Sequence, residues 1–410
     1  MNRLGLATIL AGVAAPPLAA QRFDSTFTRT IAPGVVHQRL VVDSAPWNIN
    51  VVRVDLRRSG LQLRVVHAAD AFLGRETLAA LSERHRQRGD SVVAAINADF
   101  FRLSDGEVTN NQVSDAEWWR ARHVWGAVPP IRSQFAVGAD GRLLIERFNW
   151  NGSVSTRRYP QFALDGINIR PDPDEVMLFT PHAGRTTPRD SSTGGVVERT
   201  LVLLARHHNT LRFRLEGGLR QGGGSPLGPE YALVGGSRSG GRLAALGPAG
   251  TPLEFSMVTS PARGPIAALA GGQPRLVVNG RGLADTALAD AEATNANLRQ
   301  RHPRSAVGFT RDSSTLLLVT VDGRQPASAG MDLLELSRLM LRLGAFEALN
   351  LDGGGSSTLI VAGEVVNRPS DREGPRAIGN ALLVGRPTSR RGAPRRRRSP
   401  PPGRPGSPSA

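Results

Sequence analysis

Apolar and polar residues alternate along much of the chain in the pattern of β-strands. Between residues 34 and 67, "VVHQRLVVD" and "INVVRVDL" alternate or run in β-branched residues, with turn signals between them. Residues 135–148, "FAVGADGRLLIERF", predict a hairpin around Asp140 and Gly141. In contrast, "ETLAALSERHRQ" has apolar residues at helical spacing and leads into "SVVAAINADFF", a short buried strand with a polar end.

Residues 150–265 contain short β-like runs such as "TLVLLARH" and "LRFRLEGG", separated by glycine-rich loops. Loops of this composition also occur in flexible linkers between domains. Apolar strands resume immediately on both sides, so we expect loops within a β-rich domain.

The last third of the chain shows a strand, a helix and a second strand. "STLLLVTVDGR" is an apolar run that ends at Asp322, and "FEALNLDGGG" is another that ends at Asp352. The helix between them has an apolar stripe and a glycine C-cap, at Leu333, Leu336, Leu339, Met340, Leu343 and Gly344. This βαβ pattern predicts parallel strands. The expected fold class is α+β, a β-rich mixed sheet with a C-terminal parallel βαβ unit that carries the Asp-Gly loops.

Four segments are expected along the chain. Residues 1–20 have a basic start, an apolar stretch and small residues near the end, which is typical of a secretory signal peptide. Residues 21–90 form an N-terminal β region packed on the main domain, residues 91–385, and residues 386–410 are an Arg- and Pro-rich disordered tail. The protein is therefore expected to be exported, to the periplasm or the medium.

The composition excludes several kinds of chemistry. The chain has no cysteine and no lysine, so its 51 basic residues are all Arg. Thiol nucleophiles, Schiff bases, a P-loop lysine and cysteine-ligated metals are therefore absent. The net charge is +16, and the tail contributes eight Arg and no acid. Exclusive use of Arg indicates a coding bias, so we expect no specific nucleic-acid partner; the tail either contacts an anionic surface or is simply solvated.

Asp322 and Asp352 end two predicted parallel strands, where ligands of open α/β sheets bind. Two carboxylates at one edge suit hydrolysis of a glycosidic bond, although a single Asp-Gly is more often only a turn.

The run Gly353, Gly354 and Gly355 exposes backbone N–H groups that can cradle an anion. Ser356 and Ser357 either add hydroxyl donors or start the next strand. Three arginines near these segments could bind phosphate, or could be surface residues: Arg304, Arg324 and Arg376.

Several motifs closely resemble the phosphodiester glycosidase family. They are "PRSAVGFTRDSSTLLLVTVDGR", "ALNLDGGGSSTLIVAGEVVNRPSD", "PRAIGNALLV", "ALAGGQPRLVVNG" and "AAINADFF", and the resemblance covers roughly residues 90–385. One departure concerns the last motif, because the family usually has two glycines where this chain has Ala98 and Asp99. The carboxylate of Asp99 could change the substrate size or add a catalytic or metal-binding oxygen.

The resemblance implies an exported hydrolase that cleaves sugar-1-phosphodiesters, with an N-acetylglucosamine-like sugar, to free sugar and a phosphomonoester. Asp352 would stand beside the anomeric carbon, with Asp322 as its acid/base partner or as an organiser. The expected substrate-binding residues are Asn97, Asp99, Asn279, Arg304, Arg324, Asn350, Gly353, Gly354, Gly355, Ser356, Ser357 and Arg376. The substrate would be a phosphate-linked glycan or cell-surface polymer.

Two other functions stay open at this point. A non-catalytic polysaccharide-binding protein would keep the glycines and arginines without needing paired carboxylates. A metal-dependent phosphodiesterase would use Asp99, Asp322 and Asp352 as oxygen ligands, so a divalent cation is an alternative to the expected absence of a cofactor. The tryptophans of "WWRARHVW", residues 118–125, either form a sugar-stacking platform or pack in the core.

Overall fold

A computed structural model describes residues 23–386, apart from 59, 125–131, 159–160, 191–194, 287–291 and 293–297. The predicted signal peptide and residues 387–410 of the predicted tail lie outside these ranges. Strands dominate the described residues, in three large sheets and one strand pair, β5 with β27. Among the described helices, none is long and apolar enough to span a membrane.

The first sheet has eight strands in the order β1-β2-β3-β23-β22-β24-β20-β21. One face of it packs against helix α5, whose predicted apolar stripe is entirely buried. Helix α5 starts with a capping box, in which Asp332 and Glu335 each bond the other's backbone N–H. The bounds are β1 Ser25–Ala32, β2 Val35–Val42, β3 Trp47–Asp55, β20 Arg275–Val278, β21 Arg281–Gly282, β22 Arg304–Phe309, β23 Thr315–Val321, α5 Leu333–Arg342 and β24 Glu347–Asn350.

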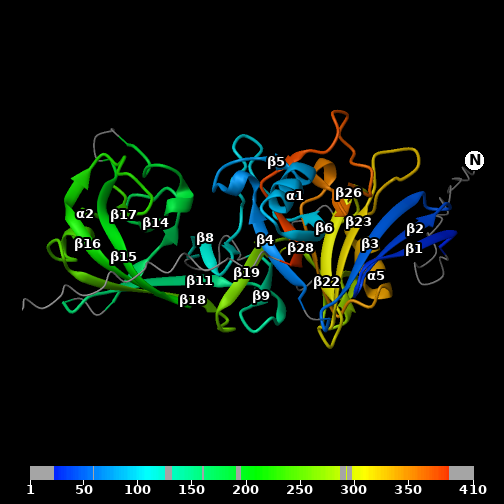
Figure 1. The fold of residues 1–410 in the computed structure, drawn as a ribbon, viewed down its shortest axis with the longest axis horizontal. Helices are drawn as coiled ribbons and strands as arrows, with labels where there is room; N and C mark the ends of the chain where they lie inside the picture. The colour runs from blue at the N-terminus through cyan, green and yellow to red at the C-terminus, as the bar shows by residue number, and fades with distance from the viewer. Residues whose placement is uncertain are drawn as a thin grey trace, which may run out of the picture.

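The second sheet has five strands in the order β26-β25-β6-β28-β4, and it packs on the other face of the first. Val52 and Val54 of β3 point toward it, whereas Val51 points toward α5, as the two-residue period of a strand requires. Helix α1 covers its far side, so the layers are α5, sheet, sheet, α1 (Figure 1). The bounds are β4 Gln62–His67, β5 Glu76–Thr77, α1 Leu78–Gln87, β6 Ser91–Asn97, β25 Leu359–Val361, β26 Glu364–Val365, β27 Ala377–Ile378 and β28 Asn380–Arg386.

The third sheet has thirteen strands and extends into the β-rich lobe on the left of Figure 1. The predicted hairpin is present, with β9 paired antiparallel to β10 and Gly141 at a positive φ of 82°. The segment between residues 150 and 265 folds into strands with their own apolar core, as expected. The bounds are β7 Gln112–Ser114, β8 Glu117–Arg122, β9 Gln134–Gly138, β10 Leu143–Glu146, β11 Asn149–Ser155, β12 Phe162–Leu164, β13 Gly166–Ile167, β14 Val176–Phe179, β15 Val197–His207, β16 Thr210–Gln221, β17 Tyr231–Gly235, β18 Pro252–Ser260 and β19 Ile266–Gly271.

Short helices complete the described chain. Two are α-helical, and three are single 3-10 turns at the ends of strands or loops. The bounds are η2 Ala68–Asp70, η3 Pro181–Ala183, α2 Gly240–Ala244, α3 Leu283–Thr286 and η5 Gly354–Ser356.

The C-terminal strand–helix–strand unit needs a correction. β23 and β24 run in the same direction, but they are not neighbours, because β22 lies between them and is antiparallel to both. The unit is therefore split by a strand that precedes it in sequence. The ends of β23 and β24 still lie at one sheet edge, where β22 begins.

Candidate active site

Three predicted residues meet at this sheet edge. Asp322 directly follows β23, Asp352 lies two residues beyond β24, and Arg304 opens β22 opposite Val321. The edge thus collects two carboxylates and a guanidinium from separate parts of the sequence.

The glycine loop, residues 353–355, follows Asp352 and is in close contact with its surroundings. A Cβ on Gly353 would lie 2.9 Å from the carbonyl oxygen of Pro303, and Gly354 has a positive φ of 63°. A Cβ on Gly355 would collide with the side chains of Asp371 and Arg376. Side chains are excluded at these positions because other groups already fill the space.

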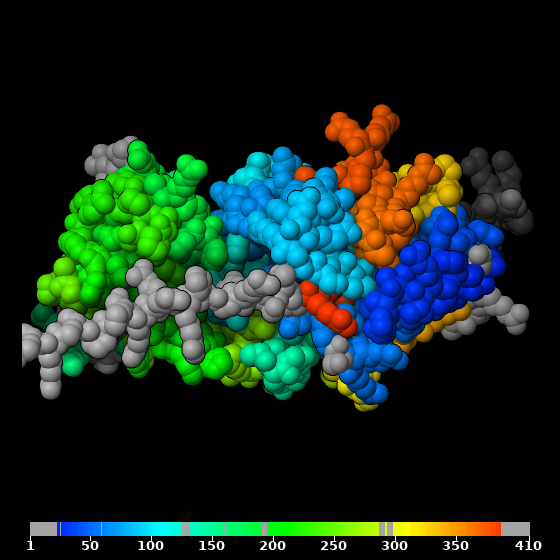
Figure 2. Space-filling view, viewed as in Figure 1, coloured from blue at the N-terminus to red at the C-terminus, as the bar shows by residue number. Residues whose placement is uncertain are grey.

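Two arginines flank this loop. Arg324 Nη2 would lie 3.3 Å from a Cβ on Gly354, while Arg376 lies against Gly355. Arg376 donates to both carboxylate oxygens of Asp371, at 2.8 and 3.2 Å. Asp371 and Arg376 also line a cavity of about 900 Å³, formed with residues 74, 75, 77, 104, 105 and 370–377. The segment 366–376 forms part of the orange projection at the top of Figure 2.

Asp352 is partly buried and its backbone is fixed on both sides. Its N–H donates to Ala98 O at 2.9 Å, and its carbonyl oxygen accepts from Asn97 Nδ2 at 2.6 Å. Burial raises the pKa of Asp352 to about 6, with Asp99 adding to the rise, while Ser356 and Arg376 oppose it. Its carboxyl group is therefore half protonated at about pH 6 and mostly ionised at pH 7.

Asp99, at the position where the chain departs from the family pattern, is only 2% exposed. Its carboxylate accepts from Asn110 Nδ2 at 2.6 Å and from Asn110 N at 3.2 Å. Its N–H donates to Asn380 Oδ1 at 2.8 Å. Burial raises the pKa of Asp99 to about 6, and the bonds from Asn110 oppose this rise. The site thus contains a further carboxyl group, that of Asp99, whose charge adds to the rise in the pKa of Asp352.

Asp322 is held differently. Its Oδ1 accepts from Arg368 N at 2.9 Å and from Asn367 Nδ2 at 3.3 Å. Burial raises the pKa of Asp322, and these two bonds lower it. The groups around Asp322 are not the ones around Asp352, so Asp322 fixes the segment that leads to Asp371 and Arg376.

Arg304 is buried and bonds two carbonyl oxygens, Met331 O at 2.9 Å and Gln300 O at 2.8 Å. Burial lowers the pKa of Arg304 to about 10, and its neighbour Arg324 lowers it further. Arg324 has a positive φ of 60° and lies 3.3 Å from His302 Nδ1 through Nη2. Positive charge therefore accumulates on the Arg324 side of the glycine loop.

The predicted asparagines have three different roles. Asn97 also accepts from Ser305 Oγ at 2.7 Å and from Thr358 N at 3.1 Å, so its amide joins three segments. Asn350 donates to Gln273 O at 2.6 Å, while its buried Oδ1 has no hydrogen-bond partner among the residues that the structure describes. The structure does not bring Asn279 to the site: its N–H donates to Glu347 Oε1 at 2.9 Å, at the opposite end of β24.

Ser356 and Ser357 are buried behind the glycine loop. Residues outside the predicted set complete the site, namely Asn110, Asn380, Asp371 and His302. Asn380 lies in the quoted motif "PRAIGNALLV", while the duplicated asparagine of "TNNQ" and the acid–base alternation of "SDREGPR" mark Asn110 and Asp371. Among the described residues, no three His, Cys, Asp or Glu side chains form a group that could hold a metal ion.

Comparisons with known proteins agree with the motif resemblance. Residues 221–385 match the model of the phosphodiester glycosidase family. The chain is 40% identical over 94 residues to the prophage-derived protein YomE of Bacillus subtilis, covering 23% of this chain and 14% of that protein. It is 36% identical over 90 residues to bovine N-acetylglucosamine-1-phosphodiester alpha-N-acetylglucosaminidase, covering 20% of this chain and 17% of that enzyme. These matches therefore span less than a fifth of the relatives' lengths.

Two solved structures share the fold. A hypothetical protein from Synechocystis has a TM-score of 0.66 at 20% identity, with 90% of this chain and 64% of that chain covered. A Burkholderia pseudomallei protein described as exported has a TM-score of 0.61 at 24% identity, with coverages of 82% and 74%. At these identities the likeness concerns the fold alone.

Proposed function

We propose, from the premise that residues 221–385 carry a phosphodiester glycosidase domain, that this protein hydrolyses sugar-1-phosphodiesters to free sugar and a phosphomonoester. The sugar we propose is N-acetylglucosamine-like, and the N-terminal pattern supports export. The observation that carries the proposal is the partly buried carboxyl group of Asp352 beside a glycine loop with an arginine on each side.

The bond to be broken joins the anomeric carbon to a phosphate oxygen. As it breaks, positive charge develops on the sugar and negative charge on the leaving phosphate. Asp352 in its ionised form would stabilise the sugar cation. Arg324 and Arg376 would bind the phosphate, because guanidinium groups match its oxygens in pairs.

Asp99 would supply the second carboxyl group of the reaction. Two buried carboxyls in one site oppose each other's ionisation, so one can stay protonated while the other is ionised. Water adds its oxygen to the anomeric carbon, one of its protons passes to a carboxylate, and the phosphomonoester leaves with the electron pair of the broken bond. A phosphate is a good leaving group, so little acid assistance is required.

Asp322 would act as an organiser rather than as the acid/base partner. It bonds residues 367 and 368, which lie four and three residues before Asp371, and Asp371 in turn holds Arg376. Arg304 would add positive charge behind Arg324 without reaching the substrate, since two carbonyl groups already hold its guanidinium.

The test is a product assay with the full chain and an N-acetylglucosamine-1-phosphodiester, with and without chelator, for wild type and Asp352→Asn. Free sugar from wild type alone is the expected result. Sugar phosphate that disappears with chelator would replace the proposal by a metal-dependent phosphodiesterase. No product from any sugar-1-phosphodiester of a panel would favour a binding protein.

A further inference from the structure

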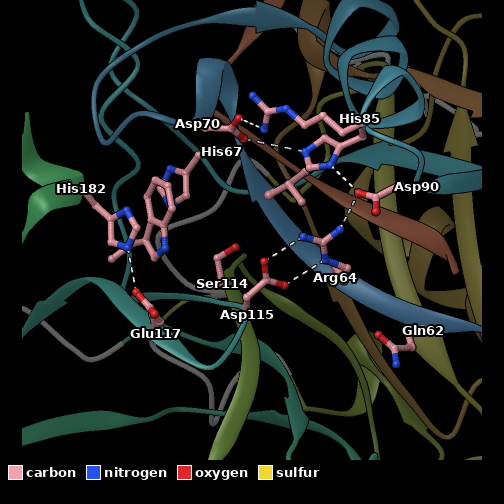
Figure 3. Close-up of a pocket in the computed structure, with 13 residues that line it drawn as sticks. Gln62, Arg64, His67, Asp70, His85, Asp90, Ser114, Asp115, Glu117 and His182 are labelled. Carbon is pink, nitrogen blue, oxygen red and sulfur yellow. Dashed lines mark hydrogen bonds and ion pairs between the residues drawn. The ribbon is translucent and has the colours of Figure 1, made fainter. Parts of the chain in front are cut away.

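A second cavity, of about 580 Å³, lies where the β-rich lobe approaches α1 and β4 (Figure 3). Its lining comes from β4, η2, α1, β7, β8 and η3, so segments distant in sequence converge on it. None of its lining residues belongs to the candidate active site. A volume of this size lies within the range of small-molecule sites, roughly 300–1,000 Å³.

One wall is a network of paired charges centred on Arg64. Its Nε and Nη2 donate to the two oxygens of Asp115 at 2.9 and 2.7 Å, and its Nη1 donates to Asp90 at 2.8 Å. Asp90 also bonds His85 Nδ1 at 2.9 Å. Arg64 is only 20% exposed, so this network is fixed rather than a loose surface pair.

The opposite wall is a stack of three rings. Trp119 lies between His67 and His182, with ring centroids 4.0 Å apart on each side. His182 Nε2 lies 2.8 Å from Glu117, which also pairs with Arg206 at 2.7 Å. Because both faces of Trp119 are covered, it is not the open sugar-stacking platform considered from the sequence.

The charges of this cavity select against ions. Each charged lining residue is paired: Arg64 with Asp90 and Asp115, Arg88 with Asp70, and Glu117 with His182. An anionic ligand therefore meets no uncompensated positive charge. A metal ion would have to displace these pairs, and no metal-binding group occurs in the described part of the chain. An apolar ligand would bury the polar lining without replacing its hydrogen bonds.

A neutral ligand rich in hydroxyl groups suits this lining. Paired carboxylates and guanidinium groups still have free lone pairs and N–H groups, held in fixed directions. Two further lining residues are His67 and His85. Among the described residues the buried Nε2 of His67 has no hydrogen-bond partner, and Nε2 of His85 lies 3.9 Å from Asp70 Oδ1. Burial lowers the pKa of His67 to about 3, so its ring stays neutral and offers one donor and one acceptor.

We propose that this cavity binds a neutral saccharide of one or two rings, at a site separate from the glycine loop. The site would hold part of a glycan while leaving the candidate active site free. The inference does not depend on the proposed hydrolysis, since it rests on a different set of side chains.

Calorimetric titration of the full chain with neutral disaccharides tests this inference. The probes are N,N′-diacetylchitobiose, cellobiose and maltose, with glucose 1-phosphate as the charged comparison. Asp115→Asn keeps the size of the side chain, and Asn tolerates the positive φ of 49° at this position. We expect it to weaken disaccharide binding by about tenfold or more, because the two bonds to Arg64 are lost or weakened.

Asp174→Asn is the matched control, since Asp174 forms an exposed pair with Arg238 on the lobe surface. Asp352→Asn is a second control for binding in the active site. The proposal predicts unchanged disaccharide affinity for Asp174→Asn, and it predicts that Asp352→Asn still binds the disaccharides at this cavity. It is overturned if no neutral disaccharide binds at millimolar concentration, if only glucose 1-phosphate binds, or if Asp352→Asn abolishes binding while Asp115→Asn does not.

Discussion

Two loops at the same sheet edge follow the same pattern, an apolar strand, then an aspartate and a glycine, but hold their aspartates differently. The glycine of each loop approaches the same residue: a Cβ on Gly323 would lie 2.6 Å from Pro303 N, and one on Gly353 would lie 2.9 Å from Pro303 O. Asp322 is bonded to the backbone and amide of a neighbouring segment. Asp352 instead lies beside a second buried carboxyl group and a loop flanked by arginines. The same local sequence thus provides a structural anchor in one loop and a candidate reactive group in the other.

The largest expected effect comes from Asp352→Asn. Removing the carboxylate that faces the developing cation should lower kcat by about a thousandfold. The fold should be kept, because the backbone bonds of residue 352 do not involve the side chain. Steady-state kinetics together with thermal unfolding check both parts. Near-wild-type turnover would remove Asp352 from the reaction.

Gly355→Ala tests whether Arg376, beside the glycine loop, must keep its present position. The new methyl group would displace the side chains of Asp371 and Arg376, and these flexible tips can move without unfolding the loop. We expect kcat/KM to fall by about a hundredfold, because misplacing a positioning group is costly for catalysis. Gly241→Ala, in a position with open space around it, is the control and should have no effect. Full activity in Gly355→Ala would show that Arg376 does not need its present position.

Asp322→Ala should mainly affect stability. Its loss leaves Arg368 N without this acceptor and leaves Asn367 Nδ2 with Ser357 O alone, which is expected to lower the free energy of unfolding by about 1–3 kcal/mol. Urea unfolding measures this difference, with Asp174→Ala as an exposed control. If stability is unchanged and kcat falls as far as in Asp352→Asn, the two aspartates would be the catalytic pair predicted from sequence.

The sequence predicted an element best where its apolar residues repeat at one spacing along the whole element. The stripe on α5 was predictable because its apolar residues repeat every three or four positions and its cap residues flank them. The insertion of β22 between β23 and β24 was not, because no local pattern says which earlier strand pairs at the centre of a sheet. A prediction of adjacent parallel strands was therefore the natural reading of the unit.

The same limit applies to the site. The glycine run and Asp352 stood out because consecutive glycines are poor packing material. Asp371 and Asn110 did not, since each lies in a polar segment and is brought to the site only by tertiary contacts. Asn279 also lies in a glycine-containing motif. The antiparallel pairing of β20 with β24 places it beside Glu347, at the end of β24 that is far from Asp352.

The pH dependence of stability gives the smallest expected effect and tests the buried carboxyl pair directly. Burial raises the pKa of Asp99 to about 6 in the folded state, against 3.8 for an ordinary aspartate. Protonated Asp99 therefore favours folding: its contribution is fully present below about pH 4 and is lost as the pH rises through about 6. Asp99→Asn does not titrate. The unfolding free energy of the variant minus that of wild type should rise by about 1–3 kcal/mol from pH 4 to pH 7.

The difference between variant and wild type is the quantity to measure, because other carboxylates titrate in the opposite direction. Asp70 and Glu76 have lowered pKa values owing to their bonds with Arg84, so their contribution to stability is lost as the pH falls. These groups are the same in both proteins and cancel in the difference. A difference that stays flat from pH 4 to pH 7 would show that Asp99 titrates normally. Asp99 would then already be ionised at about pH 6, where the proposed pair requires one of its two carboxyl groups to keep a proton.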